Sequence, residues 1–156
     1  MAKEISITDE FIYSLLSGDA ALVAELDTPP ASIGGASVYF DAIPQEVQLT
    51  NKPVIIVRHK PPREDDDFIT FNGVRIWTDV RVRIVATALV RDYAALTPAA
   101  NQIDELLHLA KRDVTGGWIH KAQRLAPYVR TYFEGNLEHR ELGADWLLQA
   151  SATVGF

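Results

Sequence analysis

The chain has 156 residues, of which 47% are hydrophobic and 23% charged, and a formal net charge of −6 at pH 7. This size and composition predict a single domain over residues 1–156, built around one hydrophobic core. The sequence contains no cysteine, which excludes disulfides and thiolate chemistry, and its acidic balance disfavours non-specific binding to nucleic acid. We expect neither an export signal nor a membrane span, because no apolar run approaches the roughly eighteen residues that a span requires.

The N-terminal segment "ITDEFIYSLLSGDAALVAEL" predicts a helix with a break. Thr8 is placed as the N-cap, and apolar residues then follow at helical spacing. Ser17 and Gly18 interrupt the pattern, and Asp19 is predicted to cap a second, short helical segment.

Two strands are predicted next, a short one in "SVYFDAIP" and a second one in "KPVIIVRHK". The segment "PPREDDDFITFNG" separates the second strand from a third, and Asn72-Gly73 offers a turn. Two strands joined by a dozen polar residues indicate a long β-hairpin whose tip, about residues 60–73, is an extended arm.

The stretch "VRIWTDVRVRIVATALV", residues 74–90, alternates with period two over nearly its whole length. Apolar side chains occupy one face, and a polar face carries Arg75, Trp77, Asp79, Arg81 and Arg83. Strands usually have about five or six residues, so one this long is predicted to extend beyond its own subunit.

The segment "LTPAANQIDELLHLAKRD" predicts a second main helix, with Thr97 as cap, Pro98 at the first helical position and Gly116-Gly117 as the stop. Strands are predicted over 128–134 and 144–154, joined by a hairpin connection over 135–143. The expected fold class is therefore α+β, with a mostly antiparallel sheet, a long β-hairpin arm and two main helices packed on one face.

Catalytic and cofactor motifs are largely absent. The sequence has no phosphate-binding loop and no Gly-x-Ser-x-Gly elbow, so we predict no cofactor. Asp104, Glu105 and His108 lie three or four residues apart on the second main helix, which suits either a surface pair or two ligands of a metal site. His59, His120 and His139 are isolated in the sequence.

Two charged features allow both structural and functional interpretations. The acidic run Glu64, Asp65, Asp66 and Asp67 lacks the alternation of a calcium loop, and is either a solvated loop or a surface facing a partner or a channel. The arginines around Trp77 suit a nucleic-acid surface, or pairing with carboxylates of neighbouring strands or subunits.

The order of "FIYSLLSGDAALVAEL", "VYFDAIPQ", "KPVIIVRHK", the alternating strand and "RDYAALTPAANQIDELL" resembles the tail terminator, or tail-completion, family of long-tailed bacteriophages. The resemblance covers about residues 7–112 and consists of a pattern of elements rather than a catalytic motif. One departure is "KRDVTGGWIHKAQRLAPYV", which is longer than the link expected before the last hairpin.

The resemblance implies a non-enzymatic virion protein of the neck, assembled in the host cytoplasm. It would form a ring, typically a hexamer, that caps the head-proximal end of the tail tube and joins it to the head connector or stopper protein. DNA would pass through the channel without specific binding. The open alternatives are another neck or tail ring protein, a metal-dependent enzyme using Asp104, Glu105 and His108, and a dimeric ligand-binding domain.

Overall fold

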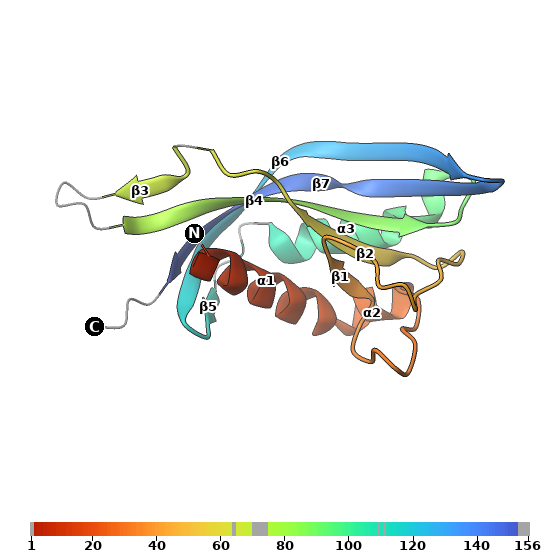
Figure 1. Cartoon of the computed structure of the whole chain (residues 1–156), viewed down its shortest axis with the longest axis horizontal. Helices are drawn as coiled ribbons and strands as arrows, with labels where there is room; N and C mark the ends of the chain where they lie inside the picture. Colours follow the sequence, from red (N-terminus) through yellow and green to blue (C-terminus); the bar gives the residue numbers. More distant parts are fainter. Residues whose placement is uncertain (1, 64, 70–74, 109, 111, 153–156) are drawn as a thin grey trace.

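The structure is a computed structural model that describes residues 2–63, 65–69, 75–108, 110 and 112–152. These residues form one seven-stranded sheet, three α-helices and a short 3-10 helix (Figure 1). The helical elements are α1 (Ala2–Ser17), α2 (Ala20–Glu25), η1 (Tyr93–Ala95) and α3 (Thr97–Leu107). The strands are β1 (Val38–Phe40), β2 (Val54–His59), β3 (Asp67–Ile69), β4 (Arg75–Ala88), β5 (Arg112–Val114), β6 (Gly117–Glu134) and β7 (Leu137–Ala152).

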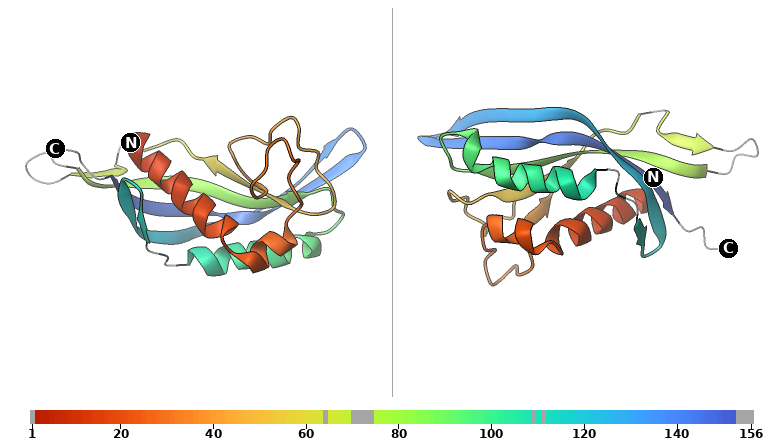
Figure 2. Two further views of the ribbon diagram at one scale, coloured as in Figure 1. Left: turned by 90° about the horizontal axis from the view of Figure 1, so that it is seen from below. Right: turned by 180° about the vertical axis from the view of Figure 1, so that it is seen from behind.

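The strand order across the sheet is β1-β2-β4-β7-β6-β5, and β3 pairs with the beginning of β4. Only the β1–β2 pair is parallel among the described strands. The helices α1, α2 and α3 lie against the same side of the sheet (Figure 2). The predicted α+β class with a mostly antiparallel sheet and helices on one face is confirmed.

The core lies between the helices and the covered face of the sheet. Phe11 and Leu16 of α1 and Ile103 of α3 pack there against alternate residues of β4, such as Val82 and Ile84, and all five are almost fully buried. The period-two alternation of β4 places Val80, Val82, Ile84 and Ala86 in this core, as the sequence predicts, whereas Ile76 of the same face is 45% exposed.

A close approach between central strands explains a glycine in β7. A Cβ on Gly143 would lie 2.0 Å from the backbone oxygen of Ile84 in β4. No side chain fits at that distance, so the pairing of β4 with β7 requires glycine at this position.

Two predicted helix caps are wrong. The first helix begins at Ala2, so Thr8 lies inside it, and its hydroxyl donates to the backbone oxygen of Glu4 at 2.8 Å. Thr97 is the first residue of α3, and its hydroxyl donates to the backbone oxygen of Tyr93 at 3.0 Å. Threonine satisfies its hydroxyl by bonding the carbonyl four residues back, which a capping prediction does not anticipate. The predicted cap at Asp19 is confirmed, because its carboxylate accepts from the Leu22 N–H at 2.9 Å.

The C-terminal half differs from the prediction. Helix α3 ends at Leu107; Gly116 lies in the turn between β5 and β6, and Gly117 begins β6, so neither glycine stops a helix. Strands β6 and β7 are joined by only Gly135-Asn136, with Gly135 at φ 63°, as a tight two-residue hairpin turn requires. The predicted hairpin connection over 135–143 is therefore wrong, and most of the unexpectedly long link over 111–129 is strand.

Two parts of the sequence prediction fall on residues that the structure does not describe. The predicted turn at Asn72-Gly73 lies outside the described residues, as does Val154 at the end of the last predicted strand. Among the residues that the structure describes, no helix is long and apolar enough to cross a membrane.

Candidate functional site

The arm projects at one end of the sheet and consists, in its described part, of Asp65–Ile69 and Arg75–Thr78 (Figure 1). The rings of Phe68 and Trp77 stack across the β3–β4 pair with their centroids 4.7 Å apart. Phe68 is 38% exposed although it belongs to this pair. The described part of the arm therefore presents apolar surface as well as charge.

The acidic run does not act as one solvated loop. Asp66 is buried: its carboxylate accepts from the Arg63 N–H at 2.7 Å and from the Arg81 guanidinium at 3.0 Å. Asp65 and Asp67 are exposed, whereas Glu64 lies outside the described residues. Asp66 is thus a structural anchor between two exposed carboxylates, of which Asp67 also accepts from the Thr78 hydroxyl at 2.5 Å.

Asp79 is buried on β4 beside this anchor. Burial raises the pKa of its carboxyl, the positive charge of Arg81 opposes the shift, and Asp66 and Asp65 add to it. Its Oδ1 atom has no hydrogen-bond partner among the described residues. The charged form of the Asp79 carboxyl is thus disfavoured at this position, because burial stabilises the protonated form.

The face of the sheet away from the helices carries ion pairs between strands. The Arg83 guanidinium donates to Asp145 at 2.7 and 3.2 Å, and Lys60 donates to the same carboxylate at 2.8 Å. Hydrogen bonds from Arg83 and then Lys60 lower the pKa of Asp145. The Arg58 guanidinium donates two hydrogen bonds, of 3.0 and 2.7 Å, to the carboxylate of the buried Glu141.

These contacts involve side chains of the polar face that was predicted for the long strand, β4. Arg81 and Arg83 both pair with carboxylates of their own chain, and the Arg83 guanidinium lies 3.8 Å from the centroid of the Tyr128 ring. Trp77 stacks within the arm, and the side chain of Arg75 lies outside the described residues. Arg81 and Arg83 are therefore engaged by carboxylates of their own chain.

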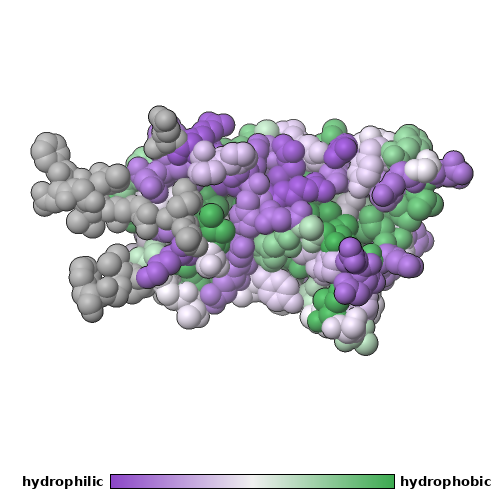
Figure 3. Space-filling view, in the orientation of Figure 1, coloured by the Kyte–Doolittle hydropathy of each residue, from purple (hydrophilic) through white to green (hydrophobic). Residues whose placement is uncertain are grey.

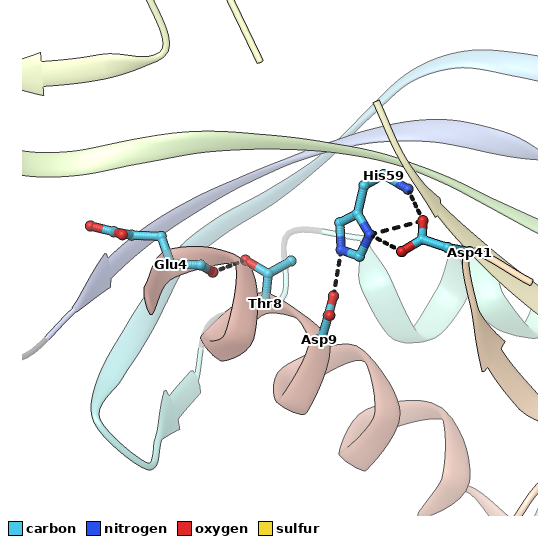
Figure 4. A network of polar contacts seen from close by, with 5 residues as sticks. All are labelled: Glu4, Thr8, Asp9, Asp41 and His59. Atoms are coloured by element: carbon cyan, nitrogen blue, oxygen red, sulfur yellow. Dashed lines mark hydrogen bonds and ion pairs between the residues drawn. The ribbon is translucent and has the colours of Figure 1, made fainter. Parts of the chain in front are cut away.

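A second polar cluster joins α1 to the edge of the sheet (Figure 4). The His59 ring lies between Asp9, 2.7 Å from Nε2, and Asp41, 2.9 Å from Nδ1. The hydrogen bond with Asp9, followed by that with Asp41, raises the pKa of His59 to about 9 against the effect of burial. Asp41 has a positive φ of 63° and also accepts from the His59 N–H. The imidazolium therefore fastens the helix to the strand.

The possible metal ligands on α3 lie beside a cation. Asp104 is 3.4 Å from the Arg124 guanidinium of β6, and burial raises the pKa of the Asp104 carboxyl despite this charge. Glu105 and His108 line the same shallow pocket. Within the described ranges, no three His, Asp or Glu side chains are grouped so that they could hold a metal ion.

The remaining histidines make contacts that need no catalytic role. The Nε2 atom of His120 lies 2.6 Å from the Ser151 hydroxyl, and burial lowers the pKa of His120. His139 is buried and stacks on Tyr132 with ring centroids 4.7 Å apart.

An exposed apolar region was missed by the sequence prediction. Leu125, Val129 and Phe133 of β6 and Leu137 at the start of β7 are 45%, 59%, 67% and 55% exposed. In Figure 3, apolar side chains lie among polar ones toward the end of the molecule that carries this hairpin tip. Open pockets flank the tip, one lined by Phe133 and Leu89 and another by Leu137 and Ile43.

Comparisons with known proteins give a likeness of fold. No protein-family model matches the chain, and no curated protein matches its sequence. A chain in a solved structure described as the virion of a native gene transfer agent particle is similar, with a TM-score of 0.60 and 17% identity. The match covers 94% of this chain and 98% of that one, so the two share their fold over almost their whole length.

Proposed function

We propose that the protein is a structural subunit of a phage-like virion, and specifically the tail terminator that caps the head-proximal end of the tail tube. The likeness to a chain of a gene transfer agent virion over nearly the full length of both proteins supports this proposal most directly. The sequence resemblance to tail terminators, which concerns residues 7–112, supports the same position within the particle.

In this proposal the subunits form a ring, taken to be a hexamer, between the tube and the head connector. The ring stops polymerisation of the tube protein, offers a joining surface to the connector or stopper, and lets DNA pass without specific binding. No chemical step is required of any residue.

The arm supplies the assembly element. Its Phe68–Trp77 stack belongs to the β3–β4 pair, at the end of the sheet that projects beyond the helices. Of the acidic run, Asp66 is committed to Arg81 and one oxygen of Asp67 accepts from Thr78, which leaves Asp65 and the exposed part of Asp67 among the described residues to face a channel or a partner. Negative charge there would repel the phosphates of passing DNA.

The test is deletion of the gene in the parent particle, with a complementing copy for propagation, followed by measurement of tail lengths by electron microscopy. Headless tails of variable, excessive length are the expected result, because nothing would then stop the tube. Tails of normal length that fail to join filled heads would place the protein on the head side of the joint, as a stopper. Normal infectious particles would overturn the proposal.

A further inference from the structure

Strand β6 has an unpaired edge along most of its length. It pairs with β7 from Gly117 to Glu134, whereas β5 covers only Gly117–Ile119 on its other side. From Gln123 to Glu134 every residue is exposed except Tyr128 and Tyr132, which are half-buried. Among the described residues, therefore, no element covers this edge, and its backbone groups can pair with an added strand.

The edge is also cationic in an acidic protein. Residues 114–133 contain Lys121, Arg124 and Arg130 but neither Asp nor Glu, although the whole chain has 21 acidic residues. Arg124 lies beside Asp104, whereas neither Lys121 nor Arg130 forms an ion pair with a described residue. Exposed Val129 and Phe133 supply apolar surface along the same segment.

These charges disfavour a symmetric partner and favour a different one. Two β6 edges paired with each other would bring like charges together, which is destabilising. The arm has the complementary properties: a short strand, the exposed carboxylates Asp65 and Asp67, and the exposed ring of Phe68. The arm lies at one end of the molecule and the β6–β7 tip at the other, so the two meet only between copies (Figure 1).

We propose that the free edge of β6 over residues 128–133, where Arg130 is the one charged residue, receives the β3 arm of a second copy of this chain. Pro127 and the bulge between Arg124 and Ala126 interrupt the earlier part of the edge, which confines regular pairing to this segment. The contact joins two different surfaces, so its repetition produces a closed ring when the rotation between copies closes. This inference rests on the proposed ring function and names the surface that accepts the arm.

Disulfide trapping tests the contact cleanly, because the chain has no cysteine of its own. Three single-substitution proteins are prepared: Phe68→Cys in the arm, Val129→Cys on the edge, and Glu25→Cys at the exposed end of α2 as the control. Each must keep the thermal transition of the parent protein. Two of them, one carrying a tag, are mixed at high concentration and oxidised mildly.

The arm and edge proteins are expected to form mixed disulfide dimers at least tenfold more than either does with the control. Dimers formed mainly by two Val129→Cys copies would show the symmetric pairing of edges and overturn the proposal. A yield of mixed dimers equal to that of the control would overturn it as well.

Charge reversal provides a second readout that a chance collision would not reproduce. Arg130→Glu in the edge protein should lower the mixed yield about tenfold. Asp65→Lys with Asp67→Lys in the arm protein should then restore it. Failure of trapping with overlong tails in the deletion strain would reject only this contact, whereas trapping with normal particles would reject only the terminator function.

Discussion

The two faces of β4 lie in different environments, although consecutive residues supply them. Val82 points into the core under the helices, where it is completely buried. Its neighbour Arg83 points to the open face, where it pairs with Asp145 and covers the Tyr128 ring. One face is thus stabilised by removal of apolar surface from water, and the other by charges matched across strands.

This difference indicates where a partner can bind. Ion pairs that are already satisfied within the chain contribute little to a new contact, because binding would have to desolvate them again. The open face therefore offers little free surface along its middle. Unsatisfied apolar and cationic groups lie instead at its border, on the edge of β6 and at the hairpin tip.

The largest effect on stability should come from a substitution in the core, on the helix-covered face of the sheet. Phe11 is fully buried in the core, so Phe11→Ala should lower the free energy of unfolding by about 3–5 kcal/mol through lost burial and a cavity. Phe133→Ala is the matched control, because Phe133 is 67% exposed and its loss should change stability by less than about 0.5 kcal/mol. Urea denaturation of both variants measures the difference. Equal losses would mean that Phe133 is packed in solution.

On the open face, the free energy of unfolding should fall strongly only when one ion of a pair is removed and the other remains. Glu141→Ala removes the buried carboxylate that pairs with the Arg58 guanidinium and leaves that charge without its partner. The variant should lower the free energy of unfolding by about 2–3 kcal/mol. The double variant Arg58→Met with Glu141→Leu should recover most of this loss, because two apolar side chains need no partner. A double variant no more stable than Glu141→Ala would show that the pair itself stabilises the face.

The sequence predicts regular elements better than interrupted ones. Residues 74–90 alternate over most of their length, so their strand and its two faces can be read directly from the sequence. Strand β6 could not be predicted in full, because two bulges shift its alternation and Pro127 argues against a strand interior. At the edge of a sheet both features are tolerated, and this position becomes visible only in the three-dimensional arrangement.

The same distinction applies to the candidate site. Asp9, Asp41 and His59 come from three separate segments, and Arg58 and Glu141 are 83 positions apart, so no local pattern predicts their contacts. The acidic run is visible in the sequence, but the burial of Asp66 depends on Arg81. The long acid-free stretch over 114–133 was available as a signal for the cationic edge.

The His59 cluster should make stability depend on pH. The pKa of His59 is raised from 6.5 to about 9, so its stabilisation is complete below about pH 6.5 and is lost as the pH rises through about 9. This contribution is on the order of 2 kcal/mol after allowance for the partial exposure of the cluster. Urea denaturation at about pH 6 and about pH 10 measures it.

The His59→Gln variant separates this effect from other titrating groups. It should lose stability at the lower pH and show little of the decrease between the two pH values, because the imidazolium is gone. An undiminished decrease in this variant would assign the pH dependence to other residues.

The smallest expected effect concerns Asp79, whose substitution should raise the stability of the protein where the substitutions above lower it. Burial raises the pKa of this carboxyl, so its contribution to stability falls as the pH rises from the unfolded pKa of 3.8 through the folded one. Asp79→Asn removes the buried charge and should stabilise the chain at neutral pH by about 1 kcal/mol, or raise Tm by about 2–4 °C. Calorimetry measures the shift, and Glu46→Gln at an exposed position is the control, with no change expected.

A lower Tm for Asp79→Asn would show that the carboxylate makes a favourable contact in its own chain. A higher Tm together with impaired ring assembly would instead explain why the residue is retained. The Asp79 carboxylate lies beside Asp66 and Arg81 on β4, the strand that pairs with β3, and β3 is where a second copy is proposed to contribute its β6 edge. An unfavourable charge in the isolated subunit would then become favourable in the ring, which favours association over the free monomer.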